Sequence, residues 1–205
     1  MTKVLFIKAN PKKTEQAFSL RLGQSFIDAY KAAHPDAEVQ ELDLYEDNIP
    51  LIDSDVMTGW GKLAQQEDLN NHEAHKVQRL GELVDQFLAT DLIVFALPMW
   101  NLGYPPMLKA YLDAVSVAGK TFKYTAEGPV GLAGGKQVVL AEARGGVYPD
   151  EILHAQKHLV GLLAFLGITD VQTVVAEGMA YNPAEGENIL AGAAQRAQTL
   201  AASFA

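Results

Sequence analysis

The chain has 205 residues, 49% of them hydrophobic and 20% charged, which is typical of a globular chain with one substantial core. Its net charge is −9, from 25 acidic against 16 basic residues, and no stretch concentrates Lys and Arg, so we expect no nucleic-acid partner. It contains no cysteine, which excludes disulfides, thiolate catalysis and cysteine-ligated metals.

Apolar runs that predict strands alternate with amphipathic helices along the chain. The first run, residues 4–9, leads into a helix over residues 16–33, where apolar side chains four apart share one face. A more polar run, residues 38–44, predicts a half-exposed edge strand. A long polar excursion over residues 46–71 follows, with a helix expected at residues 56–66, and connections of this length are more often functional than idle.

The middle of the chain contains the most apolar run. A helix over residues 72–89 precedes residues 91–98, which are nearly all apolar, as in a strand buried on both faces. A short helix begins at Pro106, where a missing N–H costs nothing. Residues 118–135 are expected to be irregular.

The remaining pattern completes the fold prediction. We expect a strand at residues 136–143, a helix at 151–166, a strand at 170–176 and a final Ala-rich helix from residue 182. Five strands separated by helices predict a single α/β domain over residues 1–205, a three-layer αβα sandwich around a five-stranded parallel sheet. Its expected strand order is 2-1-3-4-5, the flavodoxin-like arrangement.

Apolar runs also bear on location. The apolar start has four strongly apolar residues before Lys8, too few for a secretory signal, and the longest run, residues 159–168, is too short to cross a bilayer. We therefore expect a cytoplasmic protein without membrane contact.

In an open α/β sheet a ligand binds beyond the carboxyl ends of the strands, where the strand order reverses. The first segment there, residues 10–19, lacks the Gly-x-Gly-x-x-Gly of a dinucleotide-binding fold. The unpaired N–H groups opening the next helix, around Gln16 to Ser19, suit a single phosphate. Alternatively, Asn10 and Ser19 simply turn and cap the chain.

The second segment, residues 98–106, combines three prolines with an aromatic and an amide side chain. Met99, Trp100 and Asn101 could stack on and orient a flat heteroaromatic ligand. Alternatively, Trp100 plugs the core and the prolines only end the strand.

The third segment, residues 142–148, contains Gly145 and Gly146, whose backbone N–H groups can approach a ligand closely. Arg144 beside them would add positive potential and favour the negative charge on the pyrimidine end of a reduced flavin. Alternatively, the motif is a turn with a surface cation.

Over essentially its whole length the chain resembles the FMN-dependent NADH:quinone oxidoreductase and azoreductase family of the flavodoxin-like fold. The stretches that carry the resemblance are residues 3–10 (KVLFIKAN), 98–101 (PMWN), 119–125 (GKTFKYT), 143–146 (ARGG) and 165–170 (FLGITD).

The resemblance implies a set of cofactor contacts. Asn10, Gln16, Ala17, Phe18 and Ser19 would hold the FMN phosphate. The isoalloxazine ring would contact Pro98, Met99, Trp100, Asn101 and Leu102. Its pyrimidine end would contact Ala143, Arg144, Gly145 and Gly146. Many relatives have serine at the first position of the Arg-Gly-Gly motif and Ser-Gln-Ser in the phosphate turn, which puts hydroxyl contacts, but not backbone contacts, in doubt here.

The resemblance also implies a homodimer with each flavin at the subunit interface and a tyrosine, here Tyr124, near the substrate face. Topology supports this, because residues 118–135 should emerge at the end of the sheet opposite the crevice. Tyr124 would then reach a flavin by a long return or by entering the partner's site.

The implied activity is a ping-pong reaction in which NADH or NADPH delivers hydride to FMN. Quinones then become hydroquinones by two electrons, which protects against electrophilic quinones, and azo compounds are cleaved to amines. No side chain is expected to be covalently catalytic. The first alternative is a flavodoxin-type electron carrier that does not oxidise NADH itself.

A metal hydrolase is the second alternative. Its candidate ligands are His72 with His75 and His154 with His158, but the first pair lacks the His-Glu-x-x-His spacing and neither pair brings an obvious third ligand. We expect no metal site, and we interpret Asp53 and Asp55 as turn and cap residues.

Overall fold

The computed structural model describes residues 1–204. Its helices and strands follow in the order β1 (Lys3–Lys8), α1 (Phe18–Ala33), β2 (Glu38–Asp43), α2 (Ser54–Ala64), α3 (Asn71–Ala89), β3 (Leu92–Pro98), α4 (Pro106–Val115), β4 (Phe122–Thr125), β5 (Gly128–Gly131), β6 (Gln137–Arg144), α5 (His154–Phe165), β7 (Asp170–Glu177) and α6 (Gly186–Ser203). Short 3₁₀ turns precede α1, α5 and α6.

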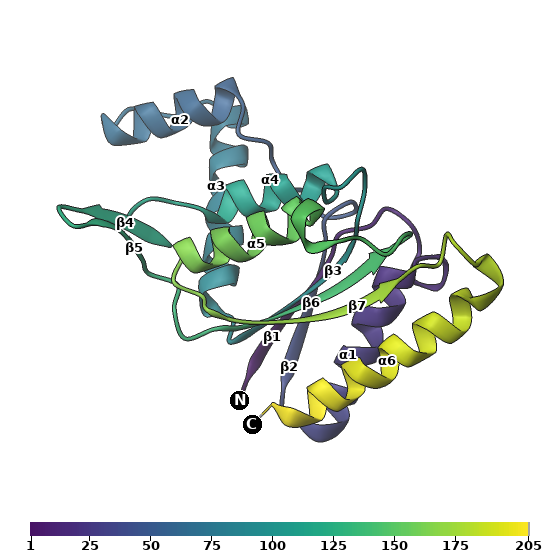
Figure 1. Ribbon diagram of the computed structural model, residues 1–205. Helices are drawn as coiled ribbons and strands as arrows, with labels where there is room; N and C mark the ends of the chain where they lie inside the picture. The colour runs from purple at the N-terminus through teal and green to yellow at the C-terminus, as the bar shows by residue number, and fades with distance from the viewer. Residues whose placement is uncertain (205) are drawn as a thin grey trace.

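Five parallel strands form the central sheet in the order β2-β1-β3-β6-β7 (Figure 1). Because β6 and β7 are the fourth and fifth strands of this sheet, the predicted flavodoxin-like order 2-1-3-4-5 is confirmed. Every residue of β3 is buried, as its apolar run predicts, whereas β2 lies at the edge and is half-exposed, also as predicted. Strand order therefore reverses direction between β1 and β3.

Helices cover both faces of the sheet, α1 and α6 on one side and α3, α4 and α5 on the other (Figure 1). Each side has its own apolar cluster, so the sheet separates two cores. Helix α1 packs closely because Gly23 has no side chain, and a Cβ there would lie 2.8 Å from Ala96 and from the Phe6 ring. Among residues 1–204, no helix has the length and apolar content needed to cross a bilayer.

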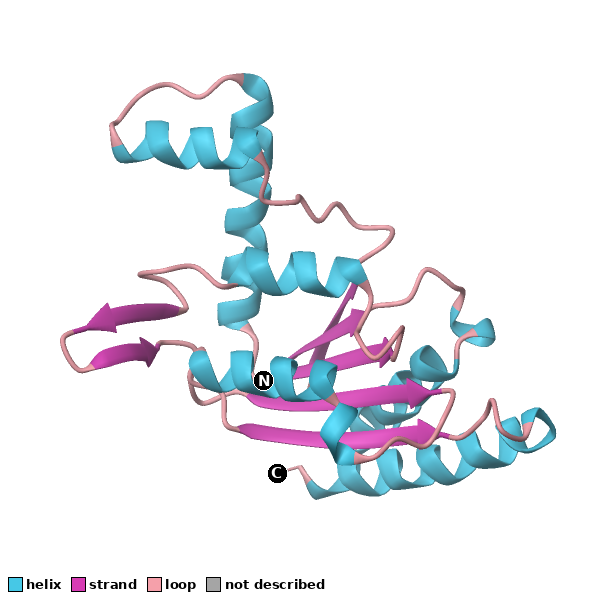
Figure 2. Ribbon diagram, turned by 45° about the horizontal axis from the view of Figure 1, so that its top comes forward, coloured by secondary structure: helices cyan, strands magenta, loops and turns pink. Residues whose placement is uncertain are grey.

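The segment 118–135, expected to be irregular, instead contains an antiparallel hairpin of β4 and β5 that projects away from the main sheet (Figure 2). Little in the residue pattern predicts this hairpin, since each strand has four residues and β5 contains two glycines and a proline, which strands disfavour. The base of the hairpin lies against the turn after α5, where a Cβ on Gly131 would meet the backbone nitrogen of Gly167 at 2.1 Å.

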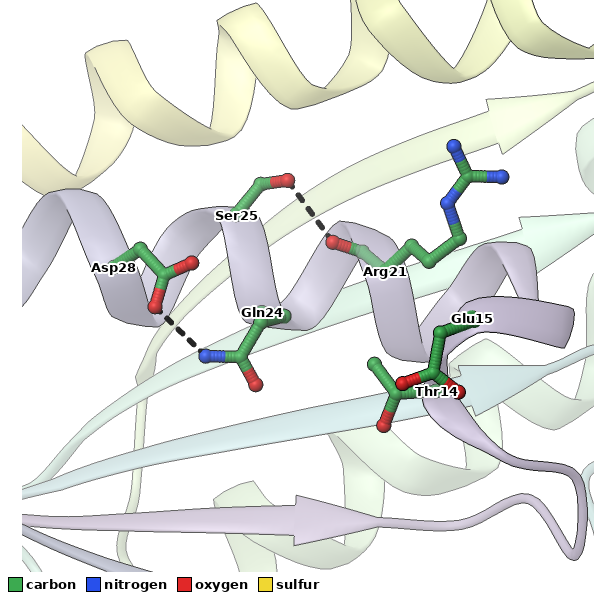
Figure 3. Close-up of a pocket in the computed structure, with 6 residues that line it drawn as sticks. All are labelled: Thr14, Glu15, Arg21, Gln24, Ser25 and Asp28. Carbon is green, nitrogen blue, oxygen red and sulfur yellow. Dashed lines mark hydrogen bonds between the residues drawn. The ribbon is translucent and has the colours of Figure 1, made fainter.

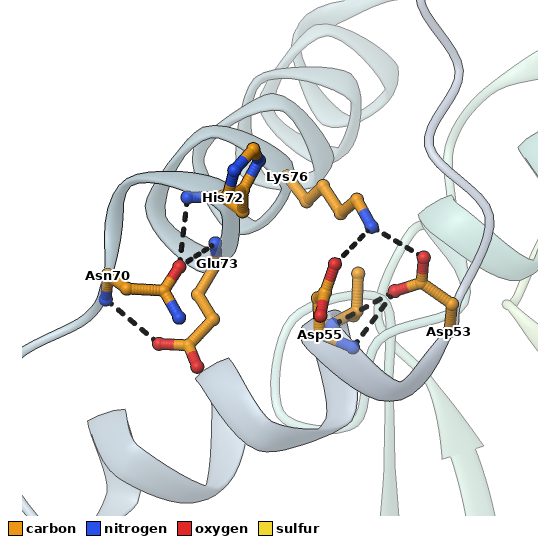
Figure 4. A network of polar contacts seen from close by, with 7 residues as sticks. Asp53, Asp55, Asn70, His72, Glu73 and Lys76 are labelled. Carbon is orange, nitrogen blue, oxygen red and sulfur yellow. Dashed lines mark hydrogen bonds and ion pairs between the residues drawn. The ribbon is translucent and has the colours of Figure 1, made fainter.

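The excursion after β2 forms an arm, defined here as residues 53–76, in which α2 packs on the start of α3 beyond the sheet (Figures 1 and 2). Asp53 caps α2 by accepting hydrogen bonds from two backbone N–H groups, as its position suggested. Lys76 pairs with Asp53 at 2.5 Å and with Asp55 at 2.6 Å (Figure 4). Lys62 pairs with Glu73 at 2.8 Å. These ion pairs join the two helices.

Candidate functional site

The carboxyl ends of β1, β3, β6 and β7 surround a cavity of about 340 Å³. All three segments singled out in the sequence contribute to it. The residues that line it are Asn10, Lys12, Gln16, Ala17, Phe18, Ser19, Pro98, Met99, Trp100, Ala143, Gly145, Met179 and Ala180. The topological rule thus locates the cavity where the strand order reverses.

One end of the cavity is the start of α1. No side chain caps this helix, whose first residue, Phe18, follows Ala17 in extended conformation. Asn10 accepts a hydrogen bond from the Lys12 backbone N–H at 3.0 Å, so it does turn the chain, but Ser19 lies inside the first helical turn and caps nothing. The Asn10 amide donates to the Ser19 hydroxyl at 3.3 Å. Uncapped N–H groups at the positive end of a helix dipole suit an anion.

The second wall is an apolar shelf of Met99 and Trp100. Trp100 is 38% exposed, so it lines the cavity mouth and does not plug the core. The chain then reverses in a tight turn, in which Trp100 and Gly103 exchange two backbone hydrogen bonds of 3.0 and 2.8 Å. Asn101 and Leu102, at φ 51° and 62°, form the tip of this type I′ turn and lie outside the cavity lining.

The third wall comes from the end of β6, where Ala143 and Gly145 face the cavity. Because side chains alternate along a strand, Arg144 points to the opposite face, toward α5. There the residue is only 4% exposed, and its guanidinium donates to both Glu142 oxygens at 2.9 and 2.8 Å and to the Gln156 amide oxygen at 2.8 Å. Arg144 is therefore neither a surface cation nor the expected source of positive potential in the cavity.

Backbone hydrogen bonds hold the walls in register. The Met99 N–H donates to the Ala143 carbonyl at 2.8 Å, which joins the shelf to the third wall. The Ala180 N–H donates to the Gly145 carbonyl at 2.7 Å, which joins that wall to the segment after β7. Gly146 is buried beside this link, and a Cβ on it would meet the Tyr181 hydroxyl at 2.9 Å.

Beyond the turn, Tyr104 anchors the shelf to α5 through a short contact between its hydroxyl and His158 Nδ1. Burial, helped by the charge of Asp113, raises the pKa of Tyr104 to about 12. The phenol therefore keeps its proton near neutral pH and can donate it to the imidazole.

Sequence reasoning missed three lining residues, Lys12, Met179 and Ala180. Met179 and Ala180 directly follow the fifth strand, so extending the strand-end rule to β7 would have found them. Conversely, Tyr124 does not line the cavity. It lies on the projecting hairpin and is 74% exposed.

A second hollow, of about 540 Å³, lies along the outer surface of α1 and is wide and shallow. Figure 3 shows the residues that line it. Its polar groups already form hydrogen bonds with one another, since Gln24 donates to Asp28 at 2.8 Å and the Ser25 hydroxyl donates to the Arg21 carbonyl at 2.9 Å. It has no apolar shelf and lies away from the strand ends, so it is the weaker candidate.

Comparisons with known proteins agree with this geometry. A family model described as flavodoxin-like fold matches residues 2–201. A FMN-dependent NADH:quinone oxidoreductase from Staphylococcus haemolyticus is 45% identical over 208 residues, covering all of both chains. Among solved structures, the azoreductase from Bacillus anthracis strain Sterne is 43% identical, with a TM-score of 0.91 and full coverage of both chains. An FMN-dependent NADH-azoreductase from Bacillus anthracis strain Ames Ancestor, in complex with FMN, is 32% identical, with a TM-score of 0.89. The match covers 98% of this chain and 100% of that one.

Proposed function

The chain belongs to the flavodoxin-like family that includes the FMN-dependent NADH:quinone oxidoreductases, and we propose that it passes hydride from a nicotinamide nucleotide to quinones and azo compounds at the cavity above β1, β3 and β6. It is an FMN-dependent oxidoreductase. Quinones are reduced to hydroquinones by two electrons, and azo bonds are cleaved to amines. The relatives reported above are named as enzymes, which favours this activity over electron carriage alone.

The observation that carries the assignment is the convergence of three unlike surfaces on one cavity. An uncapped helix start, an apolar shelf and a glycine-containing strand end match the phosphate, the rings and the polar edge of FMN. Among residues 1–204, Lys12 is the one charged side chain that lines the cavity, so the backbone N–H groups are its main anion donors. FMN therefore fits the residues that are present.

We assign roles to the predicted site residues on this basis. The N–H groups of Phe18 and Ser19 at the start of α1 hold the phosphate, with the Asn10 amide beside them. The N–H groups of Gln16 and Ala17, which the sequence also suggested, already donate to the preceding turn, so these two residues contribute to the lining and not to the anion donors. Met99 and Trp100 support the rings. The backbone of residues 143–146 meets the pyrimidine edge. Asn101 and Leu102 lie outside the cavity lining, in the turn that follows Trp100, and their proposed role is to border the substrate there.

Bound FMN supplies the capacity to accept and return a hydride. The chain would contribute orientation and exclusion, because the strand ends and the shelf of Met99 and Trp100 wall the cavity. NADH and the acceptor would then bind at this cavity in turn. Initial-rate lines at several acceptor concentrations should be parallel, and intersecting lines would contradict this ping-pong order.

We further propose a homodimer with the flavin sites at its interface, a cytoplasmic location, where NADH is available, and no nucleic-acid or membrane partner. Support for the dimer comes from exposed apolar side chains on the two projections, Met57 and Leu63 on the arm and Tyr124 and Val130 on the hairpin. Tyr124 would enter the partner's site. Sedimentation should give twice the chain mass, and a fully active monomer would remove the basis of this proposal.

The deciding experiment uses the purified protein and its visible spectrum. It should be yellow or become yellow on reconstitution with FMN, and NADH should bleach it without oxygen, with quinone restoring the colour. An electron carrier would bind FMN but stay yellow with NADH. A protein that binds no FMN would overturn the proposal entirely.

A further inference from the structure

Glu142 and Arg144 form a buried ion pair directly behind the third wall of the cavity. Their side chains are 3% and 5% exposed, and two hydrogen bonds join them. Burial lowers the pKa of Arg144, but the hydrogen bonds and charges of Glu142 and then Glu177 raise it more, so its pKa lies above the ordinary value. Nothing in the proposed reaction uses this pair.

The surroundings of the pair determine its charge balance. Glu177 approaches the guanidinium at 3.6 Å and is partly exposed. Gln156 accepts a hydrogen bond from Arg144 and donates one to the Thr173 hydroxyl at 3.2 Å. One guanidinium thus faces one fully buried carboxylate, one partly exposed carboxylate and a neutral amide.

The pair is tied to the cavity through the backbone. Ala143 and Gly145, on either side of Arg144, line the cavity, and their carbonyls accept the hydrogen bonds that fix the shelf and the segment after β7. A charge on Arg144 therefore lies within a side chain's length of the wall that meets the pyrimidine edge. Charges in a buried, weakly polarisable region act over such distances with little screening.

We propose that Glu142, by cancelling the charge of Arg144, sets the midpoint potential of bound FMN, and this inference rests on the proposed function. Reduction places negative charge on the pyrimidine end of the flavin, which an unbalanced guanidinium would stabilise. The carboxylate removes that stabilisation and keeps the reduced cofactor a strong donor. Glu142 and Gln156 are positioning residues here, since neither lines the cavity.

Two substitutions of nearly equal size test the charge balance in opposite directions. Glu142→Gln removes one negative charge and should raise the midpoint potential measured by spectroelectrochemistry. Gln156→Glu adds one and should lower it. A loss of packing alone would not give shifts of opposite sign.

The matched control is Glu82→Gln, which breaks an exposed ion pair with Arg79 on α3 and should leave the potential unchanged. Glu177→Gln should also raise the midpoint potential, but by less than Glu142→Gln. If Glu142→Gln does not fold, Glu177→Gln replaces it in the test, and an unchanged potential in that variant overturns the inference.

The outcomes separate this inference from the proposed function. Shifts of opposite sign support it. Unchanged potentials, or shifts of one sign in both variants with FMN bound, overturn it and leave the oxidoreductase assignment intact. Wild-type protein that binds no FMN overturns both.

Discussion

Leu102 adopts a backbone conformation that residues with a branched, bulky side chain rarely tolerate. Its φ of 62° follows Asn101 at 51°, and asparagine accepts this left-handed region much better than leucine does. The usual residue at this position of a type I′ turn is glycine. The Leu102 side chain is exposed at the tip of the turn, so packing does not compensate for the strain, and strain of this kind is often kept for function.

Replacing Leu102 with glycine should therefore raise the free energy of unfolding, by up to about 1 kcal/mol, because relief of strain exceeds the greater freedom of glycine when unfolded. Denaturant unfolding measures the change. Quinone reduction should become less efficient, since the apolar side chain proposed to border the substrate is lost.

Leu63→Gly provides the control, because Leu63 is similarly exposed but lies in α2 with ordinary helical geometry. It should lower the free energy of unfolding by about 1 kcal/mol. A destabilised Leu102→Gly variant would show that the turn is not strained.

At the scale of elements, the hairpin depends on a close backbone contact at its base. A Cβ at Gly131 would lie 2.1 Å from the Gly167 nitrogen and 2.2 Å from the Leu166 carbonyl carbon, neither of which can move freely. Gly131→Ala should displace the hairpin and lower the free energy of unfolding by about 1–3 kcal/mol. Unfolding curves and limited proteolysis of residues 122–131 would detect both effects.

Gly81→Ala is the matched control, because Gly81 lies within α3 and a Cβ there meets nothing within 4 Å. It should stabilise the protein by about 0.5–1 kcal/mol. A Gly131→Ala variant as stable as the wild type would mean that the hairpin is held from elsewhere.

The arm should loosen at both extremes of pH. Hydrogen bonds from Lys62 and Lys76 lower the pKa values of Glu73 and Asp53, so their contribution is present above pH about 4 and is lost as the pH falls through the lower folded-state values. The pKa of Lys76 is raised, chiefly by Asp53, so its contribution is lost as the pH rises above about 10.4.

Hydrogen exchange of the α2 amides, corrected for the intrinsic rate at each pH, should show the greatest protection between these limits. Lys76→Gln should lower this protection at neutral pH and weaken its acid dependence. Equal protection at pH about 3 and about 7 would contradict the role given to these pairs.

Periodicity allowed the sheet and its order to be predicted because buried parallel strands such as β3 need continuous apolar runs. The hairpin was missed because β5 has almost no strand signal and is defined by its contact with Gly167. The cavity walls were predictable because the carboxyl ends of parallel strands meet at one edge of the sheet. The direction of the Arg144 side chain was not, because a shift of one residue in the strand turns every side chain to the opposite face, and the register with β7 is needed to fix it. The distant partner of that side chain, Gln156, carried no local signal.

At the scale of the whole molecule, FMN should stabilise the fold by binding only its native form. Removing FMN should lower the melting temperature, and adding excess FMN should raise it with the logarithm of concentration. Riboflavin lacks the phosphate that the start of α1 is proposed to hold, so it should protect less at equal concentration. If thermal unfolding showed equal protection by both ligands, the proposal that the start of α1 binds the phosphate would be wrong.

The missing cap on α1 has a consequence for the life of the protein in a cell. Because no side chain caps the start of α1, we expect its first turn to fray in a newly made chain that has not bound its ligand, and frayed segments are preferred sites of proteolysis. Turnover should then follow vitamin supply, with the half-life shortening when riboflavin runs low. The uncapped N–H groups that bind the cofactor would thus also limit how much protein accumulates without it.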